Sequence, residues 1–207
     1  MDDRRPLGSR FQDTNKQTRE GGGLPEGSII PAGITHDLVL QFDQPARKAE
    51  REERLLAFNG GDLNATLEDI CIEGGGKDAR FLLAHGAHAN HVGEDGAHVL
   101  VRSAENGLLA VVEALLDAGA GELMRDEALL AAATRGHTAV AALLLDRGTD
   151  VHFYLDNPLY FAAYHGHLET ATLLLQRGAT ARNDILAAAV DHGHHAIADL
   201  LRAHGAS

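Results

Sequence analysis

The sequence has few of the residues that build disulfides, aromatic cores or membrane spans. Its 207 residues include one cysteine, no tryptophan and only 4% aromatic side chains. A single cysteine excludes an internal disulfide and indicates a reducing compartment. No apolar run approaches the roughly 18 residues that a membrane span needs, and residues 1–23 contain no apolar segment typical of a signal peptide. We therefore expect a cytoplasmic protein that does not enter a membrane.

Basic residues are also scarce. The chain has 18 Lys and Arg against 30 Asp and Glu, which gives a formal charge of −12. Nucleic-acid binders usually present a basic face, so this balance argues against a nucleic-acid partner and favours a partner that is itself basic. Because aromatics are few, the core must consist of Leu, Ala, Val and Ile, whose small side chains suit closely packed helices.

Glycines recur in pairs, and within each pair the two glycines are 12 residues apart. A leucine-rich segment lies inside every pair, and an alanine-rich segment precedes four of the five pairs; both have the apolar spacing of helices. Each unit therefore predicts two helices, each ended by a glycine in the left-handed conformation. Asp126, Asn157 and Asp184 are the predicted N-caps of three first helices. The pairs are Gly74/Gly86, Gly107/Gly119, Gly136/Gly148, Gly166/Gly178 and Gly193/Gly205.

Residues 157–179, NPLYFAAYHGHLETATLLLQRGA, carry the most specific pattern. They resemble the ankyrin repeat, whose typical form is Thr-Pro-Leu-His-x-Ala-Ala-x-x-Gly-His followed by Leu-Leu-Leu-x-x-Gly-Ala. The resemblance covers residues 60–207 and implies an all-α fold, an α-solenoid of about five helix-turn-helix repeats. It also implies that the histidine after the first glycine bonds to the backbone of the neighbouring turn. These histidines are His137, His167 and His194.

The repeats depart from the family in the length of their connections. The second glycines are spaced by 33, 29, 30 and 27 residues, whereas the usual ankyrin period is about 33. Since the interval of 12 is kept, the missing residues must come from the hairpins between repeats. We expect a full hairpin at residues 86–96 and shortened hairpins elsewhere.

The N-terminal third is predicted to differ from the repeats. A solenoid end needs a polar outer face, and the segment before residue 60 combines a run of charged residues with Leu55, Leu56 and Phe58, which we expect to face inward. The predicted organisation is a flexible polar arm at 1–27, a helical cap or degenerate repeat at 28–59, and the repeat domain at 60–207.

No motif indicates catalysis or a metal site. The sequence has neither a Gly-x-Ser-x-Gly elbow nor a His-Glu-x-x-His helix. Cys71 lies in a small-residue position of a first helix and is predicted to be a packed core thiol. His85, His88 and His91 cross a helix end and a turn, whereas zinc needs three or four convergent ligands. We therefore expect no catalytic residue, no metal and no cofactor.

The resemblance implies a binding face on the concave side, formed by the first helices and the hairpins. In the family, contact residues lie just before the glycine that ends the first helix, and one helical turn earlier. The candidates for partner binding are Arg102, Glu105, Asn106, Thr134, Arg135, Phe161, Tyr164, His165, Asp191 and His192.

Five of the nine aromatic residues fall within residues 153–164. Tyrosines near arginine are enriched in interface hot spots, and for Tyr164 we favour contact with a partner. For Tyr160 and Phe161 the favoured interpretation is that they fill space between repeats of small residues, although Phe161 also lies one turn behind Tyr164.

These observations favour a monomeric protein-recognition module that binds a protein partner on its concave face. A sharper alternative is an acidic inhibitor or immunity-type protein that neutralises a basic enzyme or toxin. A third alternative, from another class, is a small enzyme or ligand-binding protein with a Tyr/His-lined groove. A deep, closed pocket around Tyr164, His165 and His192 would favour this third alternative.

Overall fold

The computed structural model of the protein describes residues 44–207, and the side chains from residue 48 onward. Most of this part of the chain is helical, and none of its helices is long and apolar enough to cross a membrane. The helices are α3 (Gln44–Ala57), the 3-10 helix η1 (Phe58–Gly61), α4 (Leu63–Glu73), α5 (Gly76–Ala84), α6 (Val99–Glu105), α7 (Leu109–Asp117), α8 (Glu122–Arg135), α9 (Thr138–Asp146), α10 (Phe153–His165), α11 (Leu168–Gln176), α12 (Asn183–Asp191) and α13 (His195–Ala203).

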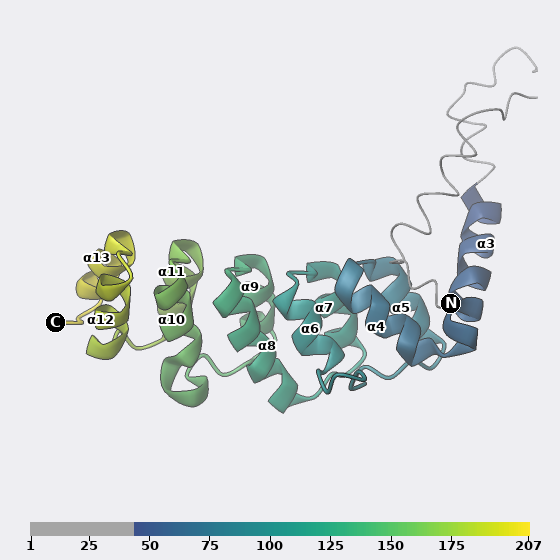
Figure 1. Ribbon diagram of the computed structural model, residues 1–207, viewed down its shortest axis with the longest axis horizontal. Helices are drawn as coiled ribbons and strands as arrows, with labels where there is room; N and C mark the ends of the chain where they lie inside the picture. Colours follow the sequence, from purple (N-terminus) through teal and green to yellow (C-terminus); the bar gives the residue numbers. More distant parts are fainter. Residues whose placement is uncertain (1–43) are drawn as a thin grey trace, which may run out of the picture.

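From α4 onward the helices form five antiparallel pairs that stack side by side along the long axis of the molecule (Figure 1). The first helices of the pairs, α4, α6, α8, α10 and α12, pack on one another in one row. The second helices, α5, α7, α9, α11 and α13, form the other row. The prediction of an all-α solenoid of about five helix-turn-helix repeats is confirmed.

Helix α3 lies at the N-terminal end of the stack and packs against α4 and α5. Leu55 is buried and Phe58 is partly buried against the core, as expected. Leu56 was expected to face inward but is 38% exposed, because it follows Leu55 on the helix and so lies about 100° away from the buried face. The predicted arm at 1–27 and residues 28–43 of the predicted cap lie outside the described residues.

The core is a double row of leucines that repeats with the glycines. One leucine lies seven residues before the first glycine of each pair, and another lies four residues before the second glycine. Nine of these ten side chains are at most 1% exposed, while Leu186 in the last repeat is 8% exposed. Burial of this kind stabilises each repeat by about 1.5–3 kcal/mol per side chain. The leucines are Leu67, Leu100, Leu129, Leu159 and Leu186 in the first helices, and Leu82, Leu115, Leu144, Leu174 and Leu201 in the second.

All ten paired glycines have a positive φ, between +70° and +106°, as the helix-ending role predicts. A histidine ring from the next repeat also covers three of the first glycines. At Gly136, a Cβ atom would lie 2.5 Å from Nδ1 of His167, and His167 donates through Nε2 to the carbonyl of Thr134 at 3.0 Å. His137 and His194 make the equivalent bonds to Glu105 and Tyr164. The backbone role implied for these histidines is confirmed.

The three predicted N-caps are wrong. Helix α8 begins at Glu122, four residues before Asp126, because the segment Glu122–Arg125 consists of good helix formers. Helix α12 begins at Asn183, so Asp184 lies inside its first turn. Asn157 lies within α10 rather than before it, and the residue with the structural role beside it is Asp156.

Polar side chains near these positions instead close each repeat on itself. In four repeats an Asn or Asp within the first five residues of the first helix accepts a hydrogen bond from the backbone N–H of the residue 24 positions later, just beyond the second helix. The distances lie between 2.8 and 3.2 Å. The second repeat has a longer connection, and there Asn90 accepts from Gly121. The four bonds are His88 to Asn64, Asp150 to Asp126, Thr180 to Asp156 and Ser207 to Asn183.

The connection at residues 86–96 is the full hairpin that was expected. Val92 and His98 form an antiparallel bridge, and the N–H of Gly93 donates to the carbonyl of Ala97 at 2.8 Å. Between the second and third repeats the chain passes from Ala120 through Gly121 directly into α8. The shorter period therefore removes the hairpin and leaves the helix pair intact.

Helix α10 opens with a left-handed turn. Tyr154, Leu155 and Asp156 have φ of 46°, 59° and 63°, and the right-handed helix follows them. Outside Gly, Asn and Asp this conformation costs roughly 1–2 kcal/mol per residue. The turn is therefore held against an intrinsic preference of Tyr154 and Leu155.

Candidate functional site

Most of the aromatic residues of α10 form one cluster with two histidines, which we call the ring cluster: Tyr160, Phe161, Tyr164, His165 and His192. The ring of Tyr164 lies between two neighbours, with centroids 3.9 Å from His192 and 6.2 Å from Tyr160. His165 meets Tyr164 edge-on at 4.9 Å. The three aromatic side chains are half-buried, and both histidines are exposed. The structure thus brings together four of the predicted candidates, Phe161, Tyr164, His165 and His192.

The geometry of the ring cluster bears on the interpretation of each aromatic residue. Tyr160 packs partly against the core and meets Phe161 edge-on at 5.3 Å, which fits a space-filling role for Tyr160. Phe161 stacks with His165 at 6.4 Å and is not part of the core. Such ring contacts add about 0.5–1.5 kcal/mol each beyond area burial, so the cluster is a preorganised surface.

Glu105 and Arg135 are joined by an ion pair of 2.6 Å between the ends of α6 and α8. Both side chains are about half exposed, so the pair remains accessible from solvent. Thr134 directs its hydroxyl to the carbonyl of Leu130 at 2.8 Å. Its side chain is therefore already used within α8, while Arg135 extends outward.

Asn106 links two repeats. Its amide donates to the carbonyl of Cys71 at 3.2 Å, because Leu108 occupies the position that histidine takes in later repeats. The Leu108 side chain lies over Gly74, where its Cδ2 would be 3.3 Å from a Cβ atom. Asn106 thus supplies the inter-repeat bond that the missing histidine cannot make.

Arg102 and Asp191 differ sharply in accessibility. The Arg102 side chain is only 17% exposed and forms an ion pair with Asp95 of the 86–96 hairpin. The hydrogen bond from Arg102 lowers the pKa of the Asp95 carboxyl. Asp191 is exposed and, among the described residues, forms no ion pair. Arg102 therefore braces the hairpin, and Asp191 is the accessible charge beside His192.

Two exposed side chains of α10, those of Tyr154 and Leu155, were not among the residues predicted to bind a partner. Tyr154 and Leu155 are 70% and 77% exposed and lie in the left-handed turn that opens α10. Their aromatic and apolar character was visible in the sequence. No signal in the sequence marked the turn, because Asn64 and Asp126 have the same bond to a residue 24 positions later without a left-handed turn directly before them.

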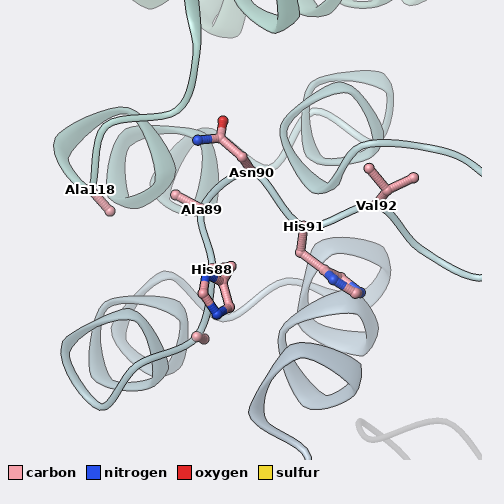
Figure 2. A pocket seen from close by; sticks show the side chains of 7 residues that line it. His88, Ala89, Asn90, His91, Val92 and Ala118 are labelled. Carbon is pink, nitrogen blue, oxygen red and sulfur yellow. The ribbon is translucent and has the colours of Figure 1, made fainter.

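Two pockets of the described residues lie away from the ring cluster. An open pocket of about 520 Å³ lies at the hairpin and is lined by Ala87, His88, Ala89, Asn90, His91, Val92 and Ala118. Figure 2 shows the side chains of His88 and His91 spread along the hairpin without converging on one point. In residues 44–207 no group of three or more His, Cys, Asp and Glu is placed to hold a metal ion.

A second pocket, of about 310 Å³, lies at the turns after α8 and α10. Its lining includes Thr138, His167 and Thr170, and the two threonine hydroxyls bond to each other at 2.7 Å. Neither pocket contains Tyr164, His165 or His192. The enclosed Tyr/His pocket that would favour a ligand-binding protein is thus not one of these two.

Several arginine side chains form ion pairs with carboxylates of neighbouring repeats. Arg147 pairs with Asp117 at 3.0 Å, and Arg177 pairs with Asp146 at 2.8 Å, along the ends of the second helices. Arg80 and Glu113 form a further pair between α5 and α7. With the arginines engaged in this way and a formal charge of −12, the surplus charge of the surface is negative.

Cys71 is fully buried, as predicted, and burial raises the pKa of its thiol from 9.0 to about 11. Between about pH 9 and pH 11 the unfolded chain releases this proton while the folded chain keeps it. The free energy of unfolding should therefore fall as pH rises through this window, by up to about 2–3 kcal/mol. Urea unfolding of the wild type and Cys71→Ala near pH 8 and near pH 11 measures the effect.

The variant provides the control, because the other groups that titrate at alkaline pH are common to both proteins. The difference in stability between wild type and Cys71→Ala should shrink at the higher pH. A difference that stays constant would show that the thiol ionises equally easily in the folded state. The folded wild type should also react slowly with thiol reagents at neutral pH.

Comparison with known protein families agrees with the helix-pair architecture of the structure. The family model described as "Ankyrin repeats (3 copies)" matches residues 100–183 and 129–207. Together these matches span residues 100–207, which are 207 − 99 = 108 of the 207 residues. No curated protein matches the chain. With stacked helix pairs, helix-ending glycines and bridging histidines, the chain belongs to the ankyrin repeat family.

Proposed function

We propose that this protein is a non-catalytic recognition module that binds a protein partner on the exposed face of its first helices. Ankyrin repeats generally mediate protein–protein interaction and are typically not catalytic. The observation that carries the proposal for this chain is the ring cluster, in which Tyr164 is held between Tyr160 and His192. Tyrosine is enriched in interface hot spots, which lie in well-packed parts of an interface.

The proposed face extends over four repeats, from α6 to α12. The Glu105–Arg135 ion pair adjoins α8, the ring cluster covers α10, and Asp191 ends α12. Along the row of first helices a partner would therefore contact the Glu105–Arg135 ion pair, then the ring cluster, and then the carboxylate of Asp191. Because the rings already pack on one another, little side-chain freedom is lost when a partner binds.

The test is affinity capture from a lysate of the source cells with the immobilised chain. We expect the Tyr164→Ala/Arg135→Ala variant to bind the captured partner at least about tenfold more weakly, since loss of a hot spot costs about 2 kcal/mol or more. The measurement is the Kd of the purified partner for each chain. Neither substitution removes a backbone acceptor of the bridging histidines, and thermal melting should verify that both chains are folded.

The matched control is Arg147→Ala/Gln176→Ala on the second helices. It also removes an arginine from an inter-repeat ion pair and shortens an exposed side chain, but on the opposite row. Equal binding by the two variants would contradict the proposal, and so would the absence of any partner that the wild type captures.

A second candidate, within the same class, is an acidic inhibitor of a basic enzyme or toxin. It is supported by the formal charge of −12 and by the pairing of arginines such as Arg147 and Arg177 with carboxylates of neighbouring repeats. For such a complex, the association rate should fall steeply as salt rises from about 0.1 M to about 1 M. A rate that hardly changes with salt would favour a neutral partner.

A further inference from the structure

The left-handed turn that opens α10 carries two large side chains that do not stabilise the folded protein through burial. Tyr154 and Leu155 are 70% and 77% exposed, so neither contributes much to the core. Both have φ in the left-handed region, where Gly, Asn and Asp are favoured. Asn at both positions would relieve the backbone and expose less apolar surface. The two residues thus carry two separate costs in the free protein.

The backbone of the turn is nevertheless fixed by hydrogen bonds to neighbouring residues. The buried carboxylate of Asp156 accepts from the N–H of Thr180 at 3.2 Å and from Nδ1 of His152 at 2.7 Å. Arg182, from the next repeat, donates to the carbonyl of Leu155. Strained backbone persists where the surroundings fix it, and such positions are often functional. The side chains of Tyr154 and Leu155 therefore project from a backbone that hydrogen bonds hold in one conformation.

The charges beside the turn that lack an ion pair among the described residues are negative. Asp126 accepts from the backbone N–H of Asp150 at 3.1 Å, where α8 meets the segment before α10, and the carboxylate of Asp150 accepts from the N–H of His152 at 2.9 Å. In the described part of the chain neither carboxylate forms an ion pair, and Arg182, the cation at the turn, is paired with Asp184. The surface around the exposed side chains is complementary to a basic partner.

The turn lies on the same helix as the ring cluster: it opens α10, and the ring cluster lies near the end of that helix. We propose that Tyr154 and Leu155 form an anchor that inserts into an apolar pocket on a basic protein partner. This inference rests on the proposed function and adds to it a second contact, at the opening of α10, with a partner of stated chemistry.

The first test needs no partner. The Tyr154→Asn/Leu155→Asn variant should melt higher than the wild type, by about 2–4 °C, because Asn adopts the left-handed conformation more readily. The matched variant is Leu123→Asn, which replaces an apolar residue of 64% exposure in the right-handed helix α8 and should not raise the melting temperature. A lower melting temperature for the double variant would show that the two side chains stabilise the fold and would overturn the anchor.

The second test locates the contact. The full chain with p-benzoylphenylalanine in place of Tyr154 is irradiated in a lysate of the source cells, with the same replacement of Leu123 as control. We expect an adduct from position 154 only, with a basic protein, that no longer forms at about 1 M salt. The purified partner should bind Tyr154→Asn/Leu155→Asn at least about tenfold more weakly than wild type.

The outcomes separate the anchor from the proposed function. If Tyr164→Ala/Arg135→Ala loses the partner while Tyr154→Asn/Leu155→Asn retains it, the first-helix face binds and the anchor is wrong. If both variants retain the partner, both proposals are wrong. An adduct with an acidic protein, or equal adducts from positions 154 and 123, would likewise overturn the anchor.

Discussion

Gly136→Ala is expected to destabilise the protein by about 2–3 kcal/mol. Gly136 has a φ of +75°, where an alanine costs roughly 1–2 kcal/mol. Its new Cβ would also lie 2.5 Å from the ring of His167, which must then move. Displacing the ring breaks its bond to the carbonyl of Thr134, and a lost hydrogen bond costs about 1 kcal/mol. Urea unfolding followed by far-ultraviolet circular dichroism measures the loss.

Gly193→Ala separates the two causes. Gly193 ends a first helix in the same way and has nearly the same φ, +77°, but a Cβ atom added there would meet no heavy atom within 4 Å. This control should lose only the backbone contribution, roughly 1–2 kcal/mol. Equal losses for the two variants would show that the histidine ring does not matter for stability.

Leu129→Ala is expected to cost about 3–5 kcal/mol. Leu129 is fully buried in α8, in the middle of the stack, where neighbouring repeats on both sides prevent the cavity from collapsing. Buried leucine-to-alanine substitutions cost the transfer free energy of the lost atoms and a further amount for the cavity. Denaturant unfolding should show a lower midpoint with a similar m-value, unless the array splits into separately unfolding parts.

Two controls bracket this result. Leu123 lies on the same helix with 64% of its surface exposed, so Leu123→Ala should change stability by less than about 0.5 kcal/mol. Leu186→Ala, in the last repeat, should cost less than Leu129→Ala because that repeat has a stacked neighbour on one side only among the described residues. A loss at Leu186 that equals the loss at Leu129 would contradict the stacking argument.

The repeat architecture was readable because its signals are local and recur at a fixed spacing. A leucine seven residues before a glycine and another four before the next define a helix pair without reference to distant residues. The helix starts were harder to predict. Asp126 looks like an N-cap by composition, yet α8 begins four residues earlier, and the competing signal was the helix propensity of Glu122–Arg125. Asp184 was misplaced by a single turn position, since α12 begins at Asn183.

The candidate face was predicted in part. Counting back from the glycines correctly placed Tyr164 and His192 on neighbouring repeats, and their rings meet at 3.9 Å. The same count placed Arg102 on the face, but its side chain is turned to the hairpin and pairs with Asp95. Position along the helix was thus predictable, whereas the partner chosen by a long side chain was not.

The sequence by itself determined the helix pairs, the turns that end them and the leucine core, since each follows from spacing within about 30 residues. Only the tertiary structure decided the contacts between repeats. The N–H of Thr180 finds Asp156, and His194 finds the carbonyl of Tyr164, because stacking brings their repeats together. It also fixed the left-handed turn at Tyr154 and Leu155. The physical reason is that local preference opposes this turn, and bonds from Thr180 and Arg182 of the next repeat help to hold it in place.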